Sequence, residues 1–178
     1  MRSDVLAAAV AAVLAGAKPD AIAAGIRSFR GVPHRLETIA ERDGVRWVND
    51  SQATIPAAAE AALEAFAPSQ IVLIAGGQGK GLDYVAFADA IADRTRAAIL
   101  IGETADELER LIGGRIPVLR AASMDEAVTL AAGSAKPGDV ALLAPAATSF
   151  DMFADYAARG DAFRDAVTAL TRSSGDES

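Results

Sequence analysis

The chain has 178 residues, which is enough for one sizeable domain, or one domain with a short appendage. Hydrophobic residues make up 52% of it and aromatic residues 5%, a composition that favours a compact α/β or α protein and argues against disorder. The net charge of −7 argues against a nucleic-acid or anionic-membrane partner, and the absence of cysteine excludes a disulfide scaffold and fits a cytoplasmic location.

Two helices are predicted at the start of the chain. The first covers about Asp4–Ala15, and its apolar run of roughly 13 residues is too short to span a bilayer. We therefore expect a buried, alanine-rich helix and not a secretory signal or a membrane segment. The second helix starts near Pro19 and places Ile22, Ile26 and Phe29 on one apolar face.

A domain boundary is predicted where Gly31-Val32-Pro33 ends the helical pattern. Residues 1–30 then form a helical piece, and residues 31–178 form the main domain. The main domain opens with two extended segments, Leu36–Ala40 and Val45–Val48. The Asp43-Gly44 pair between them predicts a β-hairpin.

Strands and helices alternate along the rest of the chain. The predicted strands are Ile71–Ala75, Ala97–Ile101, Val118–Arg120 and Val140–Ala144. One predicted helix begins near Pro56, and the others cover Tyr84–Ala92, Thr104–Ile112, 123–132 and Asp161–Thr171. Capping boxes are expected at Thr104 and Ser123, each with glutamate three residues later. The alternation predicts a Rossmann-like α/β fold: a mostly parallel sheet with an N-terminal β-hairpin and helices on both faces.

Open parallel sheets bind ligands beyond the carboxyl ends of their strands. The fold prediction therefore singles out four loops: Asn49–Ile55, Gly76–Asp83, Gly102–Thr104 and Pro145–Asp151. Most of them are rich in polar or small residues. The residues alone indicate an α/β domain with an anion-binding edge and no further detail of its chemistry.

The loop of residues 76–81 is glycine-rich but departs from the phosphate-binding pattern G-x-x-x-x-G-K-[ST]. Ile74 stands where the first glycine belongs, and Gly81 replaces the hydroxyl residue after Lys80. Lys80 can hold a carboxylate or phosphate as a point charge. A solvated lysine on a strand–helix turn is an equally good interpretation of the same residues.

The other polar candidates also have structural alternatives. Alone, His34 is more typical of a structural histidine, and Arg35 of a surface arginine, although a guanidinium can bind phosphate in a forked geometry. The polar run 49–54 and Thr148-Ser149 can cap helices or receive an anion, and Phe150 fits a core position by pattern. The sequence contains no histidine pair, no cysteine and no carboxylate cluster with metal-ligand spacing.

At these loops the sequence resembles the C-terminal portion of the Mur ligase family, in the form that adds D-glutamate. The similar motifs are Gly31–Glu37, Trp47–Thr54, Gly76–Lys80 and Pro145–Phe153, the last followed by Arg159-Gly160-Asp161-Ala162-Phe163. They occur in order over essentially the whole chain. The resemblance implies an ATP-dependent amide ligase of peptidoglycan synthesis, with residues 1–30 as a helical remnant of its central ATPase domain.

The resemblance also implies roles for individual residues. D-glutamate would be bound by Lys80, Ser149, Phe150, Thr54, Gln52 and Tyr156, and ATP by Arg35, Asp50 and His34. The full enzyme would also use Mg2+ and UDP-N-acetylmuramoyl-L-alanine, through domains that this sequence does not contain. The chain alone is therefore expected to be inactive, with no complete catalytic set and no metal ligands of its own.

Two positions depart from the pattern of this family. Gln52 stands where the family usually has lysine, and Ile55 stands where it has asparagine. Without the ammonium group of that lysine, the electrostatic argument that D-glutamate binds at this loop is weaker. Two alternatives stay open: the C-terminal domain of another Mur or folylpolyglutamate-type ligase, and a stand-alone, non-catalytic binding module.

Overall fold

The computed structural model describes residues 2–29, 31–66 and 70–173. The chain divides into two compact units, Met1–Gly31 and Val32–Ser178. We describe each unit by itself. The assignment of the first unit to a central ATPase domain stays a prediction.

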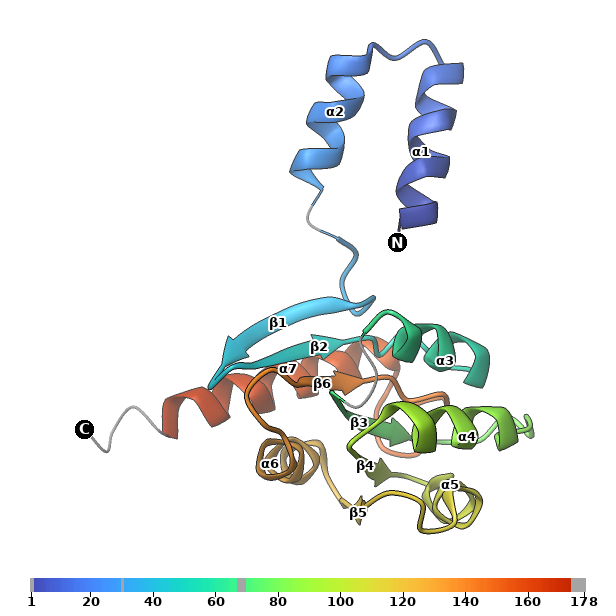
Figure 1. The fold of residues 1–178 in the computed structure, drawn as a ribbon, viewed down its shortest axis with the longest axis vertical. Helices are drawn as coiled ribbons and strands as arrows, with labels where there is room; N and C mark the ends of the chain where they lie inside the picture. The colour runs from blue at the N-terminus through green and yellow to red at the C-terminus, as the bar shows by residue number, and fades with distance from the viewer. Residues whose placement is uncertain (1, 30, 67–69, 174–178) are drawn as a thin grey trace. The chain divides into compact units, whose positions relative to one another are not determined.

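The first unit is a pair of helices, α1 (Arg2–Leu14) and α2 (Pro19–Ser28) (Figure 1). The expectation of a buried first helix is wrong, because Leu6, Val10, Val13 and Leu14 are 51–82% exposed. The helix is apolar on all sides, and a single neighbouring helix can cover only one of them. In the described part of the chain, no helix is long and apolar enough to cross a membrane.

The second unit opens with the predicted hairpin, in which β1 (Glu37–Arg42) pairs antiparallel with β2 (Val45–Asn49). Arg42 and Val45 face each other across the turn. The two residues between them, Asp43 and Gly44, have φ angles of 51° and 75°. This left-handed pair is the geometry of a two-residue turn that matches the twist of a hairpin, and the hairpin prediction is confirmed.

The remaining elements alternate as predicted. They are α3 (Pro56–Glu64), β3 (Ile71–Gly76), α4 (Val85–Arg94), β4 (Ala97–Ile101), α5 (Ala105–Ile112), β5 (Val118–Arg120), α6 (Met124–Ser134), β6 (Val140–Leu143) and α7 (Tyr156–Ser173). The six strands form one sheet in the order β1-β2-β6-β3-β4-β5. Only β1 runs antiparallel to its neighbour. The Rossmann-like fold class is confirmed.

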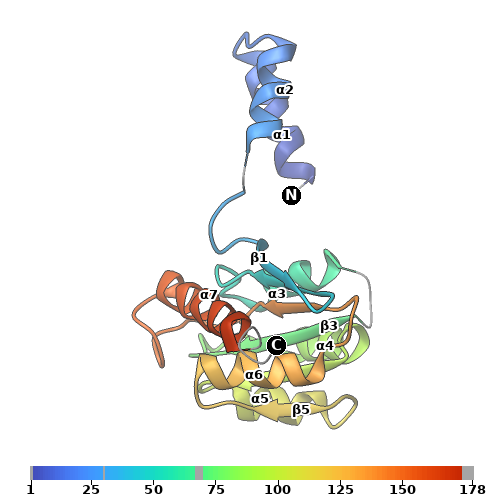
Figure 2. The same cartoon turned by 90° about the vertical axis from the view of Figure 1, so that its left-hand side faces the viewer.

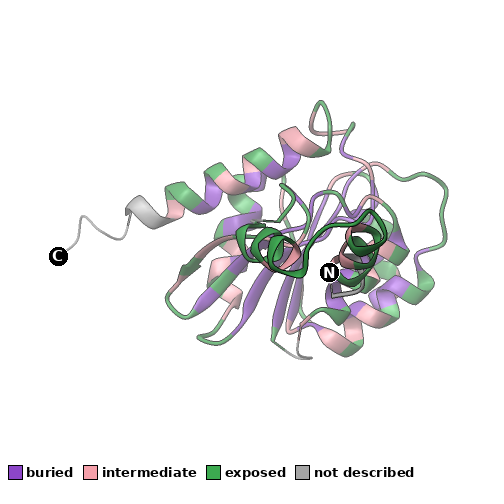
Figure 3. Ribbon diagram, turned by 90° about the horizontal axis from the view of Figure 1, so that it is seen from above, coloured by how far each residue is buried: buried purple, intermediate pink, exposed green. Residues whose placement is uncertain are grey.

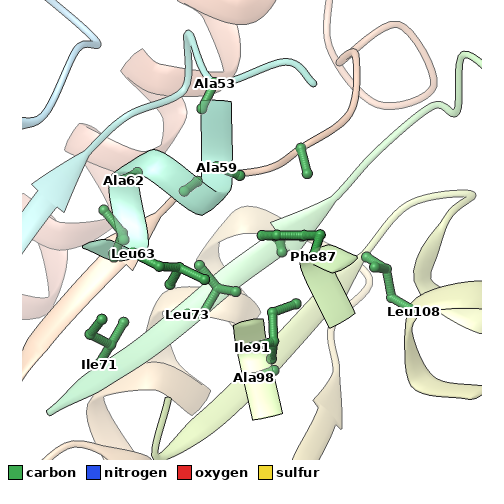
Figure 4. Close-up of a cluster of buried hydrophobic side chains, with 14 of the residues drawn as sticks. Ala53, Ala59, Ala62, Leu63, Ile71, Leu73, Phe87, Ile91, Ala98 and Leu108 are labelled. Atoms are coloured by element: carbon green, nitrogen blue, oxygen red, sulfur yellow. The ribbon is translucent and has the colours of Figure 1, made fainter. Parts of the chain in front are cut away.

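Helices cover both faces of this sheet (Figures 1 and 2). Successive side chains of a strand point to opposite faces, so Leu73 packs with α3, α4 and α5, whereas Val72 and Ile74 pack with α6 and α7. Figure 4 shows the first of these clusters, in which Leu63, Phe87 and other side chains meet the sheet. Figure 3 shows the buried residues concentrated along the strands. The two cores hold the strand ends, and with them the loops, in fixed positions.

One of the two predicted capping boxes is wrong. Ser123 accepts a hydrogen bond from the amide of Glu126 at 3.2 Å, and the Glu126 carboxylate accepts one from the amide of Ala122, so α6 is capped. Thr104 makes no such bond, because its backbone (φ −78°, ψ −2°) is already helical. A side-chain cap needs an extended residue at this position.

The last helix begins at Tyr156, earlier than the predicted Asp161. Gly160, which precedes the predicted start, lies within the helix. A Cβ atom at Gly160 would overlap Nδ1 of His34, so the glycine allows α7 to pack closely against that ring. The hydroxyl of Thr148, one of the possible caps, donates a hydrogen bond to the main-chain carbonyl of Gln78 at 2.9 Å.

Candidate functional site

The four predicted loops lie at one edge of the sheet, because β2, β3, β4 and β6 are parallel and end there. The adjacent strands β3 and β6 lead to helices on opposite faces, β3 to α4 and β6 to α7. Ligands of open α/β sheets bind where such connections diverge. The gap between these two strand ends is therefore the expected position of a binding site.

Main-chain hydrogen bonds join the loops to one another. Gln78 and Thr148 exchange two, at 2.9 and 3.0 Å. The amide of Thr104 donates to the carbonyl of Gly77 at 3.0 Å, and the amide of Ala146 donates to the carbonyl of Ala53 at 2.9 Å. The predicted grouping of these loops is present, and it is rigid because backbone groups hold it together.

The glycines of the β3–α4 loop permit this close approach. Gly77 has a φ of 139°, and a Cβ atom there would overlap the carbonyl oxygen of Thr148. A Cβ atom at Gly76 would likewise overlap the carbonyl oxygen of Ile101. Both positions require glycine for contact between backbones, which accounts for the glycine-rich loop without a phosphate ligand.

Lys80 and Thr54 lie next to each other at this edge. The Nζ atom of Lys80 is 3.5 Å from Oγ1 of Thr54, and the lysine is exposed. A hydrogen bond of this length is weak, so the ammonium group stays available to an anion. The structure thus brings together two of the residues predicted to bind D-glutamate.

The other predicted D-glutamate residues surround the same strand ends. Ser149 is buried, whereas Phe150 is 65% exposed, so the core position that its pattern suggested is wrong. Tyr156 is 40% exposed, and its main-chain carbonyl accepts a hydrogen bond from Ser51 at 2.7 Å. Gln52 is exposed, and its main-chain amide donates to the main-chain carbonyl of His34. Their ability to bind D-glutamate stays a prediction.

His34 is a buried hub at the start of the hairpin. Its Nδ1 atom lies 3.1 Å from the side-chain nitrogen of Asn49, which also donates to the carbonyl of Gly160 at 3.0 Å. The amide of His34 donates to the carboxylate of Glu37 at 2.9 Å. Its φ of 60° is unusual for a residue with a side chain. These contacts hold the β1 entry against α7, which is a structural role.

Asp50 and Arg35 form the polar group beside His34. Burial raises the pKa of Asp50, while a hydrogen bond from the amide of Leu36, at 2.9 Å, and the charge of Arg35 act in the opposite direction. Arg35 is exposed. The three residues predicted to contact ATP therefore lie close together, and their contact with ATP stays a prediction.

Arg159 is a buried residue that pattern reasoning did not select as part of the site. It lies on α7 with no exposed surface, and its guanidinium group donates four hydrogen bonds of 3.0–3.1 Å. The acceptors are the hydroxyl and carbonyl oxygens of Ser51 and the carbonyls of Ala147 and Thr148. Burial lowers its pKa to about 10, and the nearby Asp151 acts to raise it. No spacing rule reveals such a residue, because its partners come from distant loops.

Within the ranges that the structure describes, no three histidine or carboxylate side chains are grouped so that they could hold a metal ion. The polar edge offers an ammonium group, a guanidinium group, hydroxyls and main-chain amides. Such donors suit a carboxylate or phosphate ligand.

Comparison with known proteins extends this description. Residues 34–147 match the family described as Mur ligase, glutamate ligase domain. The UDP-N-acetylmuramoylalanine--D-glutamate ligase of Solibacter usitatus is 47% identical over 167 residues, covering 94% of this chain and 38% of that protein. The enzyme of the same name from Acidobacterium capsulatum is 48% identical, covering 93% and 36%. The chain therefore spans less than two-fifths of the length of these relatives.

A similar fold occurs in a solved structure of a pseudomurein peptide ligase type C from Methanothermus fervidus. The TM-score is 0.69 with 18% identity, covering 93% of this chain and 35% of that one. At this identity the likeness concerns the fold alone. The family match over most of the second unit, together with the identity to the two bacterial ligases, shows that the chain belongs to the Mur ligase family and carries its glutamate ligase domain.

Proposed function

We propose that this chain is the C-terminal part of an ATP-dependent amide ligase that adds D-glutamate to UDP-N-acetylmuramoyl-L-alanine. The observation that carries the proposal is the meeting of Lys80, Thr54 and the Ser149 loop at the diverging ends of β3 and β6. The names of the relatives that match along 94% of the chain support D-glutamate as the proposed substrate.

D-glutamate fits the donors of this edge. It has two carboxylates, and the exposed ammonium group of Lys80 can bind one of them through a charge-assisted hydrogen bond. The hydroxyls of Thr54 and Ser149 can donate neutral hydrogen bonds that orient the molecule. Phe150 and Tyr156 offer exposed ring surface beside them, and Gln52 an exposed amide.

ATP would approach the group formed by Arg35, Asp50 and His34. A guanidinium group suits a phosphate, and Arg35 is exposed on this side of the hairpin. His34 fits less well as a direct ligand, since its Nδ1 atom faces Asn49 and its Nε2 atom lies 3.9 Å from a carboxylate oxygen of Asp161. We assign no described residue of this chain to Mg2+.

Residues 1–30 are proposed to belong to the central ATPase domain of the ligase. Support comes from the exposed apolar side chains of α1, because a face with Leu6, Val10 and Val13 on it needs a partner to be stable in water. The chain alone is proposed to hydrolyse no ATP, since its sequence contains no G-x-x-x-x-G-K-[ST] loop.

In the proposed reaction the substrate carboxylate attacks the γ-phosphate of ATP, displaces ADP and forms an acyl phosphate. The amine of D-glutamate then displaces phosphate through a tetrahedral intermediate and forms the amide. This chain would contribute by positioning the amine and by stabilising charge. Its residues at the sheet edge need only hold D-glutamate in the correct orientation.

The test measures phosphate release by the full ligase and by this chain, each with ATP, Mg2+, UDP-N-acetylmuramoyl-L-alanine and one amino acid. The proposal expects turnover by the full ligase with D-glutamate, little with L-glutamate or L-lysine, and none by this chain alone. A preference for another amino acid, or for a folate acceptor, would assign the chain to a different ligase of the superfamily. Binding of D-glutamate without turnover by any longer form would favour a non-catalytic module.

A further inference from the structure

Arg159 is a buried cation that hydrogen-bonds only neutral acceptors within the part of the chain that the structure describes. Nε and Nη2 bind the hydroxyl and carbonyl oxygens of Ser51, both at 3.0 Å. Nη1 binds the carbonyls of Ala147 and Thr148, both at 3.1 Å. Burial of a charge without a paired carboxylate opposes folding. The contribution of this side chain is therefore geometric: it holds four oxygen atoms in fixed places.

The four acceptors lie on two loops that carry proposed D-glutamate residues. Ser51 precedes Gln52 and Thr54 in the β2–α3 loop, and Ala147 and Thr148 directly precede Ser149 in the β6–α7 loop. The guanidinium group thus joins the two loops through their four oxygen atoms, in addition to the main-chain hydrogen bond from Ala146 to Ala53. A shift of the guanidinium group would move both sides of the site relative to each other.

The third loop of the site also rests on Arg159. A Cβ atom at Gly77 would lie 3.1 Å from Nη1 of Arg159, so the β3–α4 loop, which presents Lys80, passes directly beside the guanidinium group. Ser51 adds a further link, because its hydroxyl donates to the main-chain carbonyl of Tyr156 at 2.7 Å. Each of the elements proposed to bind D-glutamate therefore contacts Arg159 or its direct partner.

We propose that Arg159 is a positioning residue for D-glutamate, which sets the relative placement of Lys80, Thr54 and Ser149 and acts through Ser51 and the β6–α7 loop. This inference rests on the function proposed above. Arg159 has no exposed surface and therefore offers none to a ligand. Its planar guanidinium group carries five N–H donors on three nitrogens, whereas lysine carries three donors on one nitrogen and cannot reach the same four acceptors in this geometry.

The decisive variant is Arg159→Lys in the full ligase, because it keeps the charge and removes the planar guanidinium group. A displacement of about 1 Å at a reacting group can lower kcat/KM about a hundredfold, and we expect the KM for D-glutamate to rise about tenfold or more. The KM for ATP is expected to stay unchanged. The carboxylate of Asp50 is held by the amide of Leu36, and its main chain by the carbonyl of Leu143, so neither contact involves Arg159.

Ser51→Ala is the second variant, for the case that Arg159→Lys does not fold. It removes one hydroxyl group from a fully buried residue. The hydrogen bonds from the guanidinium group of Arg159 to main-chain carbonyls stay in place. We expect a smaller rise in the KM for D-glutamate, again without a change for ATP. Arg115→Lys is the matched control, because Arg115 also binds two main-chain carbonyls, those of Ile112 and Leu111, but lies in the α5–β5 turn, away from the site loops.

The outcomes separate this inference from the proposed function. A rise in the KM for D-glutamate alone, in Arg159→Lys or Ser51→Ala but not in Arg115→Lys, supports the positioning role. An unchanged KM for D-glutamate, or an equal rise for ATP and D-glutamate, overturns it while the proposed function stands.

If the unmodified ligase does not use D-glutamate at all, the proposed function fails. The amide spectrum of this 178-residue chain then decides only whether Arg159 sets the relative placement of the three loops. Selective shifts at residues 51–54, 77–80 and 147–150 in Ser51→Ala and Arg159→Lys, absent from Arg115→Lys, support it. A spectrum without such shifts overturns it.

Discussion

The ammonium group of Lys80 lies 3.5 Å from the hydroxyl group of Thr54, although 26 positions of sequence separate the two residues. Each residue follows a different parallel strand, β3 and β2, and these strands are not neighbours, because β6 lies between them. Their loops meet above the end of β6, where the Ser149 loop begins. The meeting point of the three loops is thus a consequence of the strand order.

Lys80→Ala is expected to raise the KM for D-glutamate in the full ligase about ten- to a hundredfold, the loss expected for a hydrogen bond to a charged group. Ser149→Ala should raise it by a smaller factor, about two- to tenfold, because its hydroxyl is a neutral donor. Steady-state kinetics at saturating ATP measures both. Lys136→Ala, an exposed lysine in the turn before β6, is the control. Normal D-glutamate kinetics in both site variants would refute the assignment of these residues.

The strands, the hairpin and the carboxyl-edge loops could be predicted because their signals are local. Asp43-Gly44 selects its own turn geometry, and the apolar runs at Ile71 and Ala97 mark buried strands. Arg159 could not be recognised in this way, because its partner Ser51 is 108 positions away. The start of α7 was missed for a related reason. Helix α7 packs at Gly160 against the ring of His34, which is distant in sequence, so no local pattern reveals that contact.

Ile55→Asn is expected to be more stable than Ile55→Ala by about 1 kcal/mol, the usual effect of a good helix cap. Ile55 is the N-cap residue of α3, with extended backbone (φ −139°, ψ 153°) and no side-chain hydrogen bond to the helix. It is 41% exposed, so more than half of its apolar surface is buried, and the asparagine and alanine variants both lose that burial. Urea unfolding of the chain measures the change.

Ile55→Ala is the control for this prediction, because alanine removes the same side chain and supplies no acceptor. Equal stability of the asparagine and alanine variants would show that no cap forms. A gain with asparagine alone would mean that the asparagine usual in the family at this position can act on helix α3, so that its absence here need not alter the D-glutamate site.

Asp139→Asn is expected to lower the free energy of unfolding at neutral pH. Asp139 is buried, which by itself raises its pKa, but hydrogen bonds from Arg96, at 2.7 and 3.0 Å, and from the amide of Lys136 outweigh burial and lower the pKa. A lowered pKa in the folded state stabilises the protein above the ordinary carboxyl pKa of about 4 and loses this effect as the pH falls below it.

The pH dependence distinguishes this ion pair from a general packing effect. The stability difference between the original chain and Asp139→Asn should be full near pH 7 and shrink as the pH falls below about 4. Asp165→Asn, at an exposed position of α7, is the control and should show little difference at either pH. A difference for Asp139→Asn that stays constant with pH would rule out the charge as its source.

Gly160→Ala is expected to destabilise the chain even though alanine favours helices by about 1 kcal/mol over glycine. Gly160 lies within α7, and a Cβ atom there would overlap Nδ1 of His34 and lie 3.0 Å from Nδ2 of Asn49. The ring of His34 would have to move and break its contact with Asn49, which leaves buried polar groups without partners. Urea unfolding measures the loss, and the shifted His34 ring resonances report its cause.

Gly133→Ala is the matched control for this prediction, because Gly133 also lies within a helix, α6, and a Cβ atom there would meet no atom within 4 Å. Without a clash, only the preference of alanine for the helix remains, so this variant should be more stable by about 0.5–1 kcal/mol. The two substitutions are chemically identical and differ only in their surroundings. Opposite signs would therefore attribute the loss at Gly160 to the His34 contact, whereas a gain at both positions would mean that α7 and His34 are not tightly packed.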